Sequence, residues 1–412
     1  MSSVVYHFSY MVIQKREIRN IHEIFVSARH QRGEMEDIMK TVCRENKCNG
    51  CKACIDKCPK SCIIFRDDIN NMNCYIDESK CINCHLCENL CPNNNEIEAV
   101  QPIFWRQGWT QLDSRAISSS GGAAFTIINM FIQSGGYVAA CLFKDGDFIF
   151  EITNDLDIAK KFAGSKYVKS NPIGIYAKIS HTLQKHKVLF IGLPCQVAAL
   201  KNYIKNKENL YTIDLICHGT PSAKLLKKFL EEKNFYINEL KDIKFRKKQN
   251  MVSPFDDKSI ALSCVTDEYS LTFLKSINYT ENCYSCQFAN IKRVSDITLG
   301  DSWGTEYKCE ERNGVSLILC QTEKGIQMLN DSKMILKEVD LNQAIEYNHQ
   351  LSRPSVKPEK RTMFLKLIED GKTYRYATYK CLPKTIFKQN IKYLMLKLHI
   401  IKSGRYGITI VK

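Results

Sequence analysis

Cysteine is the residue type most able to do chemistry in this chain, and its spacing is regular. The sequence holds 20 cysteines among 412 residues, and eleven of them fall between Cys43 and Cys91. Two runs with the pattern Cys-x2-Cys-x2-Cys-x3-Cys-Pro begin at Cys48 and Cys81. In bacterial ferredoxins, three thiolates of such a run bind one 4Fe-4S cluster and the fourth binds the other. The spacing therefore predicts two 4Fe-4S clusters, with the ligand sets Cys48, Cys51, Cys54, Cys91 and Cys81, Cys84, Cys87, Cys58.

A structural zinc site is the main alternative for such cysteines. Zinc takes its ligands in two pairs and has no use for a third in-line thiolate or for a fourth that crosses to a second site. The two runs therefore favour iron–sulfur clusters. Cys43, Cys62 and Cys74 lie nearby but off the pattern. We interpret them as small, buried hydrophobic residues.

Four later cysteines suggest a third metal centre. Cys195 and Cys217 directly follow apolar stretches, and Cys283 and Cys286 form a Cys-x2-Cys pair. Ligands of α/β proteins commonly bind at the carboxyl ends of strands. From the spacing alone, a third cluster, a zinc ion, a redox pair and unrelated buried thiols all remain open.

The elements that must position these residues divide the chain into four segments. Residues 1–42 show no periodicity and are predicted to be a poorly ordered extension. Residues 43–98 form a two-cluster ferredoxin-type domain whose halves repeat at a period of 33. Residues 99–350 alternate apolar strands with helices, and residues 351–412 are basic and mostly helical. The predicted fold class is α+β and α/β: a ferredoxin-like domain, a larger mixed α/β domain and a helical C-terminal tail.

Within the larger domain, the expected strands are apolar runs bounded by turn residues. A helix is expected to follow the Ser-Gly-Gly at 120–122 as far as Ile132, a second to follow Cys195, and a third to lie near 222–233. The expected strands are 137–143, 148–152, 188–193, 210–216, 297–300 and 315–320.

Several stretches in this domain resemble the coenzyme F-420 hydrogenase/dehydrogenase beta-subunit family. The most specific are GLPCQ, GSKYV and GDSWG, and the resemblance runs in order over roughly residues 40–350. Members of this family bind a flavin, usually FAD, and an iron–sulfur cluster in this domain. They pass electrons between a reduced deazaflavin, or a similar hydride donor or acceptor, and iron–sulfur carriers. By this resemblance, the ligands of a third 4Fe-4S cluster are Cys195, Cys217, Cys283 and Cys286.

The resemblance also implies an FAD site in two segments. One is Ser120, Gly121 and Gly122, and the other is Gly164, Ser165, Lys166 and Tyr167. A Ser-Gly-Gly at a helix start presents free N–H groups and the positive end of the helix dipole to a pyrophosphate, and Lys166 would add positive charge. Taken alone, however, a Ser-Gly-Gly is most often a cap and a Gly-Ser-Lys-Tyr loop most often a turn.

The same resemblance leaves three further residues open. Asp301 and Trp303 of GDSWG are as suited to line the cofactor as to pack a turn, and His218 is left without a role. No catalytic residue is predicted.

These features predict an iron–sulfur flavoprotein oxidoreductase. A hydride donor would reduce FAD, and electrons would pass through the third cluster and the paired clusters to a redox partner protein or a small electron carrier. The reverse direction would use the same residues. The alternative is a non-catalytic, ferredoxin-like carrier whose α/β domain docks a partner enzyme.

The charge is concentrated at the C-terminus. The formal net charge is +15, and residues 351–412 carry +12 of it. Lysines 384, 388 and 392 fall on one face of an expected helix. Peripheral contact with a membrane through this basic tail is one possibility, but we favour a helix that packs its apolar face on the domain. No nucleic-acid partner is expected, because no recognition motif accompanies the charge.

We expect the protein to be cytoplasmic. Cluster ligands must stay reduced, as cytosolic thiols do. The first residues lack the basic region and small-residue cleavage site of a signal peptide. No run of about 18 apolar residues predicts a membrane span.

Overall fold

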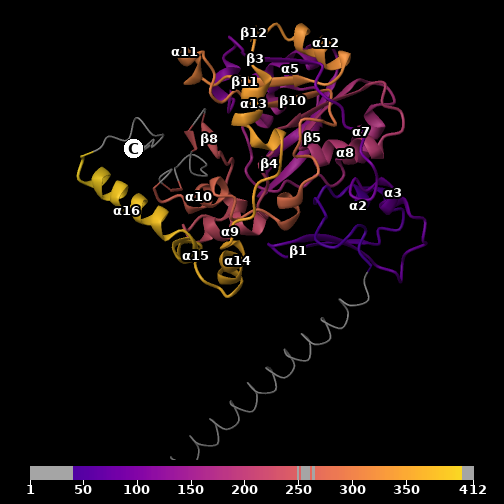
Figure 1. Ribbon diagram of the computed structural model, residues 1–412. Helices are drawn as coiled ribbons and strands as arrows, with labels where there is room; N and C mark the ends of the chain where they lie inside the picture. The colour runs from indigo at the N-terminus through magenta and orange to yellow at the C-terminus, as the bar shows by residue number, and fades with distance from the viewer. Residues whose placement is uncertain (1–39, 248–249, 252–259, 262–264, 401–412) are drawn as a thin grey trace, which may run out of the picture.

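A large mixed β-sheet, with a small cysteine-rich unit against one side, forms the body of the protein (Figure 1). The computed structural model describes residues 40–247, 250–251, 260–261 and 265–400. Residues 1–39 of the predicted N-terminal extension and residues 401–412 of the predicted tail lie outside the described residues.

The cysteine-rich unit repeats in its backbone as well as in its sequence. It consists of α2 (Ala53–Lys57), β1 (Ile63–Asp67), β2 (Met72–Ile76) and α3 (Leu86–Leu90), and its two strands pair antiparallel. Lys52 and His85 precede the two helices and adopt the left-handed conformation, with φ of 59° and 56°. Residues other than glycine rarely adopt this conformation. Its occurrence at equivalent positions shows that both cysteine runs wind in the same way.

The large sheet has eight strands in the order β12, β3, β11, β10, β7, β6, β4, β5. The four central neighbours β10, β7, β6 and β4 are parallel, and antiparallel strands flank them. This sheet, together with the ferredoxin-like unit, confirms the predicted fold class. The strand bounds are β3 (Phe104–Trp109), β4 (Tyr137–Lys144), β5 (Asp147–Thr153), β6 (Val188–Gly192), β7 (Leu210–Leu215), β10 (Ile297–Asp301), β11 (Ser316–Cys320) and β12 (Ile335–Lys337).

The six strands expected from the sequence all form, each within one residue of its expected ends. Strands β3 and β12 were not predicted. In the middle of β3, Gln107 is fully buried and bonds to Ser302, Thr305 and Glu306, so a buried polar network replaces the apolar signal. Strand β12 is only three residues long, too short to give a pattern.

Helices cover both faces of the sheet. On one face lie α5 (Ala123–Gln133) and α12 (Glu323–Asp331), and on the other α7 (Ile175–Thr182) and α8 (Pro194–Tyr203). Strand β6 shows the division, because Leu189 and Ile191 point into the first core and Val188 and Phe190 into the second. Each such buried apolar side chain contributes about 1.5–3 kcal/mol.

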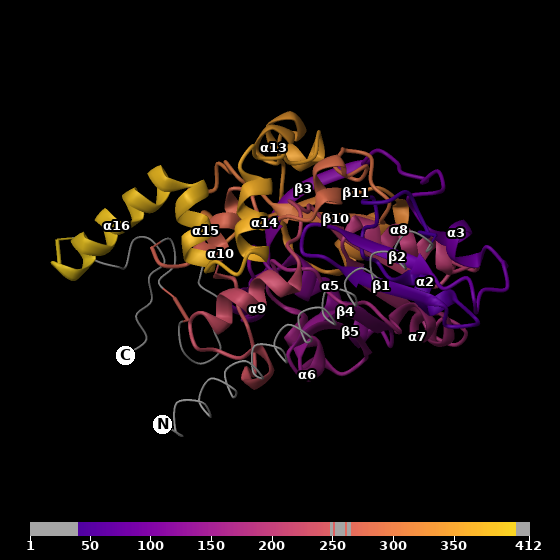
Figure 2. The ribbon, with the colours of Figure 1, turned by 90° about the horizontal axis from the view of Figure 1, so that it is seen from below.

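The cysteine-rich unit packs on α7 and α8 (Figure 2). The Tyr176 hydroxyl donates to the carbonyl of Cys51 at 2.8 Å, and the Asn202 amide donates to the carbonyl of Leu90 at 3.0 Å. The carboxylate of Asp56 accepts a hydrogen bond from the backbone N–H of Gly174 at 2.8 Å. Both cluster loops of the unit are therefore fixed to the helices that cover this face of the sheet.

A third core lies under the far ends of β4 and β5. Four helices meet there, and Phe143, Phe148 and Phe229 pack between them. These helices are α9 (Ala223–Glu231), α10 (Glu268–Leu274), α14 (Arg361–Glu369) and α15 (Tyr374–Cys381). The remaining elements are α4 (Ser114–Ile117), α6 (Leu156–Ala159), η1 (Lys160–Phe162), η2 (Ile237–Glu239), β8 (Arg246–Lys247), β9 (Asn250–Met251), η3 (Glu281–Ser285), α11 (Lys308–Glu311), α13 (Leu341–Tyr347) and η4 (His349–Leu351).

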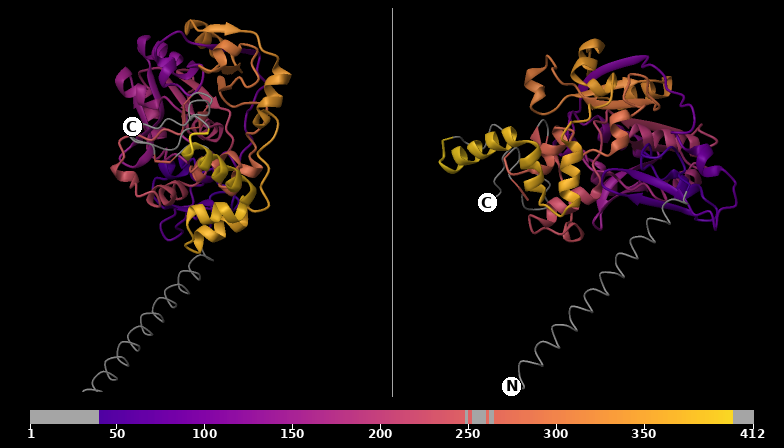
Figure 3. Two further views of the ribbon diagram at one scale, coloured as in Figure 1. Left: turned by 90° about the vertical axis from the view of Figure 1, so that its left-hand side faces the viewer. Right: turned by 60° about the horizontal axis from the view of Figure 1, so that its bottom comes forward.

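The last helix, α16 (Pro383–Lys397), projects away from the body (Figures 1, 2 and 3). Its side chains Phe387, Ile391 and Leu394 are 65%, 45% and 56% exposed, and only Ile386 and Gln389 are buried. The interpretation that this helix packs its apolar face on the domain is therefore wrong for these side chains. Among the described residues, no helix combines the length and the apolar content needed to span a bilayer.

Helix α10 begins at a buried carboxylate. Asp267 is 1% exposed and accepts a hydrogen bond from the Ser270 backbone at 3.0 Å, while its other oxygen has no hydrogen-bond partner. Burial raises the pKa of Asp267 to about 7, and Glu268 adds to the rise. The neighbouring Glu268 pairs with Lys233 and Arg375, so α10 is tied to the segment after α9 and to α15.

We predict that Asp267 makes stability fall as the pH rises. Because its folded-state pKa is raised, its contribution is complete below about pH 4 and is lost as the pH passes through about 7. Between pH 5.5 and 8.5 the free energy of unfolding should decrease by on the order of 2 kcal/mol, because each pKa unit corresponds to about 1.4 kcal/mol. Asp267→Asn keeps a good N-cap and should remove this part of the slope. Anaerobic urea unfolding at the two pH values measures it, and equal slopes for the two proteins would contradict the assignment.

Candidate metal centres and the adjoining polar site

The first predicted ligand set surrounds a single cavity. A hollow is lined by Cys48, Cys51, Cys54 and Cys91, together with other residues of the same unit. Cys91 comes from the second cysteine run, so the fold brings the fourth residue of one run to the first three of the other, as the ferredoxin pattern requires. Four cysteines around one space are a donor set that fits a 4Fe-4S cluster.

Two cysteines outside the pattern, Cys43 and Cys74, line the same cavity. Both are buried, as expected, but they are also thiol donors. Hydrogen bonds from Cys43 and Cys74 bring the pKa of Cys48 well below its ordinary value, and a hydrogen bond from Cys43 lowers the pKa of Cys91. Hydrogen bonds to ligand sulfurs are one of the factors that set the potential of a cluster. The interpretation of these residues as simple hydrophobic side chains missed this property.

The second predicted ligand set lies nearer the surface. Cys84 is exposed, and Cys58 and Cys81 are partly exposed. A third off-pattern cysteine, Cys62, has its sulfur 3.3 Å from that of Cys58, and burial, then Cys58 and Cys81, raises its pKa to about 12. Cys87 is buried, and burial, followed by the charge of Cys54, raises its pKa. In the described part of the chain, no three His, Cys, Asp or Glu side chains converge closely enough to hold one metal ion; a cubane spreads its thiolates over separate irons.

The fold also gathers the four later cysteines. Cys195 follows β6, Cys217 follows the neighbouring parallel strand β7, and Cys283 and Cys286 lie in and just after η3. Burial raises the pKa of Cys217 to about 12 and of Cys286 to about 11, and the nearby thiolates add to both shifts. The pKa of Cys195 is raised by burial and by the other three thiolates, against the effect of Lys169. The four thiols therefore lie within the range of one another's electrostatic influence.

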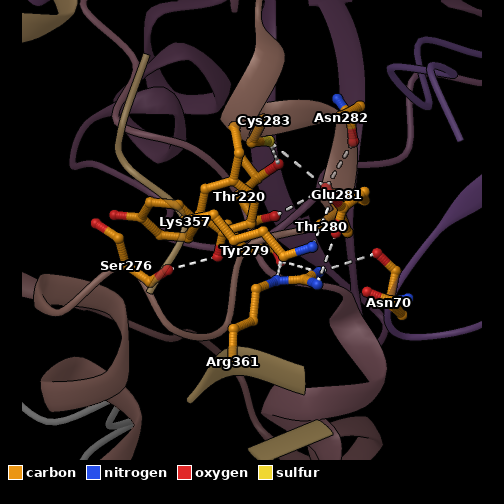
Figure 4. Close-up of polar contacts among 11 residues, drawn as sticks. Asn70, Thr220, Ser276, Tyr279, Thr280, Glu281, Asn282, Cys283, Lys357 and Arg361 are labelled. Atoms are coloured by element: carbon orange, nitrogen blue, oxygen red, sulfur yellow. Dashed lines mark hydrogen bonds and ion pairs between the residues drawn. The ribbon is translucent and has the colours of Figure 1, made fainter. Parts of the chain in front are cut away.

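The loop that carries Cys283 and Cys286 is held by a buried arginine (Figure 4). Arg361 of α14 is 1% exposed; it donates to the Tyr279 carbonyl at 2.7 and 3.0 Å and to the Glu281 carboxylate at 2.8 Å. It also donates to the carbonyl of Asn70 in the cysteine-rich unit, at 3.2 Å. One guanidinium therefore fixes the entry to the Cys-x2-Cys loop and ties it to the hairpin between β1 and β2.

A second buried arginine lies after the same loop. Arg293 forms an ion pair with Asp214 at 2.8 Å, and the two side chains are 1% and 0% exposed. The guanidinium also donates to the carbonyls of Phe288 and Leu215 at 2.8 and 2.9 Å. The carboxyl end of β7, which leads to Cys217, is thus joined to the segment that leaves Cys286.

The two segments predicted to bind FAD lie side by side. The backbone N–H of Ser165 donates to the Ser119 hydroxyl at 2.8 Å, so the loop before α5 meets the loop after η1. Gly121 must be glycine because a Cβ would lie 2.4 Å from the Gly108 carbonyl oxygen. Gly164 has a φ of +87° and open space beside it. The α5 N-terminus and this open loop offer N–H groups that fit a phosphate.

Two residues of these segments have partners that the sequence did not predict. The ammonium of Lys166 donates to the carbonyls of Phe162 and Ala163 at 2.7 and 3.1 Å, and burial lowers the pKa of Lys166. It therefore caps η1 in this structure. The Ser120 hydroxyl donates to the Val315 carbonyl at 2.9 Å and holds the Ser-Gly-Gly segment to the strand β11 side of the sheet.

A polar group lies at the carboxyl ends of β7 and β10, next to Tyr167. Arg246 of β8 forms a two-pronged ion pair with Asp301 at 2.5 and 2.8 Å, and its guanidinium lies 5.1 Å from the Trp303 ring. Burial raises the pKa of Tyr167, and the positive charge of Arg246 opposes this rise. Asp301 and Trp303 were left open by the sequence, and Arg246 was not predicted, because no motif marks it.

His218, beside Cys217, borders this polar group. Its ring bonds to Gln350 at 2.8 Å, and the ring of His349 lies 6.0 Å away. Burial, then His349, lowers the pKa of His218 to about 4, with Asp301 opposing and Arg246 adding to the decrease. A neutral imidazole therefore lies between the cysteine group and the polar group.

We predict that Arg361 controls the third centre. Arg361→Met leaves the Tyr279 carbonyl without its buried donor, at a cost of about 1–3 kcal/mol, while Glu281 keeps only Lys357 as an ion-pair partner. After anaerobic reconstitution, iron per chain should fall from about twelve toward eight, because a cubane holds four irons.

Lys357→Met is the matched control for Arg361. Lys357 pairs with the same carboxylate of Glu281, at 2.9 Å, but its side chain is 42% exposed. Exposed pairs contribute roughly 0–1 kcal/mol, so this variant should keep its iron. Full iron loading of Arg361→Met would contradict the prediction.

Comparison with known proteins agrees with this architecture. Residues 185–343 match the family model for the C terminus of the beta subunit in coenzyme F420 hydrogenase/dehydrogenase. Residues 47–95 match a 4Fe-4S dicluster domain. A search of curated proteins found no match.

One similar solved structure is a chain of the xenon-derivatised F420-reducing NiFe hydrogenase complex from Methanosarcina barkeri. It is 16% identical, with a TM-score of 0.45, and the similarity covers 77% of this chain and 99% of that chain.

The dicluster match contains both cysteine runs, and the beta-subunit match contains Cys195, Cys217, Cys283 and Cys286. The sequence-based assignment of the family is therefore confirmed. The chain is an iron–sulfur oxidoreductase in which residues 185–343 match the C terminus of the coenzyme F420 hydrogenase/dehydrogenase beta subunit and residues 47–95 match a 4Fe-4S dicluster domain.

Proposed function

We propose that the protein transfers electrons between a hydride donor or acceptor and a redox partner, through FAD and three 4Fe-4S clusters. The observation that carries the proposal is the position of Cys195, Cys217, Cys283 and Cys286. They gather at the carboxyl edge of the sheet, with the ferredoxin-type unit on one side and the polar group of Arg246 on the other. The proposed domains are residues 43–98 and 99–350, followed by the basic tail.

The residues of this site would have separate roles in cofactor binding, electrostatics and proton transfer. The N–H groups at Ser120–Gly122 and the loop Gly164–Tyr167 would hold the flavin, and an FAD bound there would exchange electrons singly or in pairs, which a cubane cannot. Arg246, fixed by Asp301, places a positive charge beside Tyr167. The lowered pKa of His218 keeps its imidazole neutral, so it would be able to accept a proton at the edge of this site.

The proposed hydride carrier is coenzyme F-420 or a similar cofactor, as the family name suggests. At the other end of the route, Cys84 is exposed and lies between Ile82 and Leu86, which are 56% and 40% exposed. An apolar surface beside the outer cluster suits the docking of a redox partner protein or small carrier. A reducing compartment such as the cytoplasm would keep the thiolates available.

We predict about twelve irons and one flavin per chain after anaerobic purification and reconstitution. Reduction of a dye with reduced deazaflavin, NADH or NADPH as the donor then tests turnover. The expected result is dye reduction with at least one hydride donor, and loss of it in Cys283→Ser. A protein with about eight irons, no flavin absorbance and no turnover would instead be the non-catalytic carrier.

A specific observation also supports peripheral contact with an anionic membrane. Along α16, the exposed apolar side chains Phe387, Ile391, Leu394 and Leu398 follow the spacing of one helical face. Lysines 384, 388 and 392 run along one flank of this face, and from Gly371 to Lys412 the sequence contains no Asp or Glu. Such a helix lies in the bilayer interface, with apolar residues inserted and lysines against anionic headgroups.

Co-sedimentation with phosphatidylserine-containing vesicles tests this contact. Wild type should bind, and Phe387→Ser with Leu394→Ser should reduce binding at least tenfold, because insertion of the apolar side chains is lost. High salt should also weaken binding, because each lysine adds about 1 kcal/mol at an anionic surface. The control Tyr379→Ser removes an exposed aromatic residue of α15 outside this face. Equal binding of all variants, or equal binding to neutral vesicles, would exclude the contact.

A further inference from the structure

A buried lysine lies where the first and third predicted centres meet. Lys169 is 7% exposed, and its ammonium donates to the carbonyl of Asn49, inside the first cysteine run, at 3.1 Å. Its own backbone N–H donates to the carbonyl of Pro221, four residues after Cys217, at 2.9 Å. A Cβ on Gly50 would lie 3.5 Å from its Cδ, so the stem of the lysine runs directly under the loop Cys48–Cys51.

The charge of Lys169 faces thiolates from both centres. Burial lowers the pKa of Lys169, but Cys283, Cys195, Cys217 and Cys48 more than offset this, so the pKa lies above its ordinary value. The four groups that raise it are thus three predicted ligands of the third centre and one of the first. A buried ammonium is costly unless anionic groups surround it. Here the anionic groups are cysteine sulfurs.

The two ligand loops also contact each other directly around this lysine. The Asn282 amide donates to the Asn49 side chain at 3.2 Å, and Lys47 donates to the Ser285 hydroxyl at 2.7 Å. The amide of Gln287 donates to the carbonyl of Pro92, next to Cys91, at 2.9 Å. The loop Cys283–Cys286 therefore lies against both segments that supply ligands to the first centre.

The second predicted ligand set differs from the other two in its surroundings. Its outer members Cys81 and Cys84 lie toward the surface, and none of its members is among the thiolates that most raise the pKa of Lys169. Lys169 is therefore associated with the first and third predicted centres.

We propose that Lys169 is a positioning residue for electron transfer: its ammonium lies between the third centre and the centre of Cys48, Cys51, Cys54 and Cys91, and it stabilises an added electron on either. This rests on the proposed function. A cubane with four thiolates carries net negative charge, and reduction adds one more unit. Clusters bound at these sites would exchange one electron at a time, with no bond formed or broken, and the lysine would keep its proton. A positive charge shared by both clusters raises both potentials together, so the step between them stays balanced.

The test compares Lys169→Met and Lys169→Arg in the full-length, reconstituted protein, by redox titration monitored by electron paramagnetic resonance. Cys84→Ser identifies the signals of the second centre. Lys169→Met should disfavour reduction of the first and third centres at least tenfold, which is 59 mV for a one-electron couple, and should leave the second unchanged. Lys169→Arg retains the charge and should restore both potentials.

Lys201→Met is the matched control, because Lys201 is also a partly buried lysine and lies on the helix that carries Cys195. Its pKa is lowered by burial, and the charged groups that act on it are Asp296, Lys207, Glu98 and Asp214, none of them a cysteine. This variant should leave all three potentials as in wild type.

Several outcomes separate this proposal from the proposed function. If Lys169→Met loses iron only from the first and third centres, keeping about four irons, the need for the charge at both is still shown. Unchanged potentials, equal shifts of all three centres, a shift in Lys169→Arg as large as in Lys169→Met, or loss of all clusters would overturn the role of Lys169. A wild-type protein with only two cluster signals would instead defeat the three-cluster function itself.

Discussion

Repulsion between neighbouring thiolates is the constraint on which the rest of this structure depends. Each predicted centre needs four anionic sulfurs within a small, partly dry space, and buried charge without compensation is costly. The chain provides hydrogen-bond donors and a buried cation near these sulfurs. The backbone N–H of Gly50 and the thiols of Cys43 and Cys74 donate to ligand sulfurs, and the ammonium of Lys169 adds a nearby positive charge. Cys74 and Lys169 come from segments distant from Cys48 in the sequence, so their part of the compensation can exist only in the folded chain.

The topology of the sheet explains why distant cysteines meet. Strands β6 and β7 are parallel neighbours, so the residues that follow them, Cys195 and Cys217, emerge at the same edge. The remaining pair arrives on a loop without strand support. Arg361 and Arg293 supply that support. The buried guanidinium of Arg361 bonds to the Tyr279 carbonyl before the loop, and that of Arg293 bonds to the Phe288 carbonyl after it and to the Leu215 carbonyl at the end of β7. A few buried arginines thus replace the regular hydrogen bonds that a strand would have provided.

The features that the sequence predicted are those carried by local patterns. Cysteine spacing predicted the dicluster unit, and short apolar runs predicted six strands, because ligand spacing and period-2 burial are written in consecutive residues. Lys169 and Arg246 carry no such mark, since their roles depend on partners more than 50 residues away in the chain. Strand β3 was not predicted for the same reason. The buried amide of Gln107, in the middle of that strand, forms its hydrogen bonds with the distant loop 302–306. Helix α16 shows another limit of sequence-based prediction. Its residues predicted an amphipathic helix, but only the fold shows that the apolar face of this helix is exposed to solvent.

The two halves of the ferredoxin-type unit are alike in backbone but differ in surroundings. Lys52 and His85 share the same left-handed turn, yet the loop of Lys52 packs on α7, whereas the loop of His85 remains open to solvent. A buried cluster lacks the water that stabilises added negative charge, so its reduction is harder unless the protein supplies a cation. The buried half has Lys169 at this point, and the open half has water. An internal repeat can therefore place its two ligand sets in unlike environments, with a lysine from outside the unit beside the buried set.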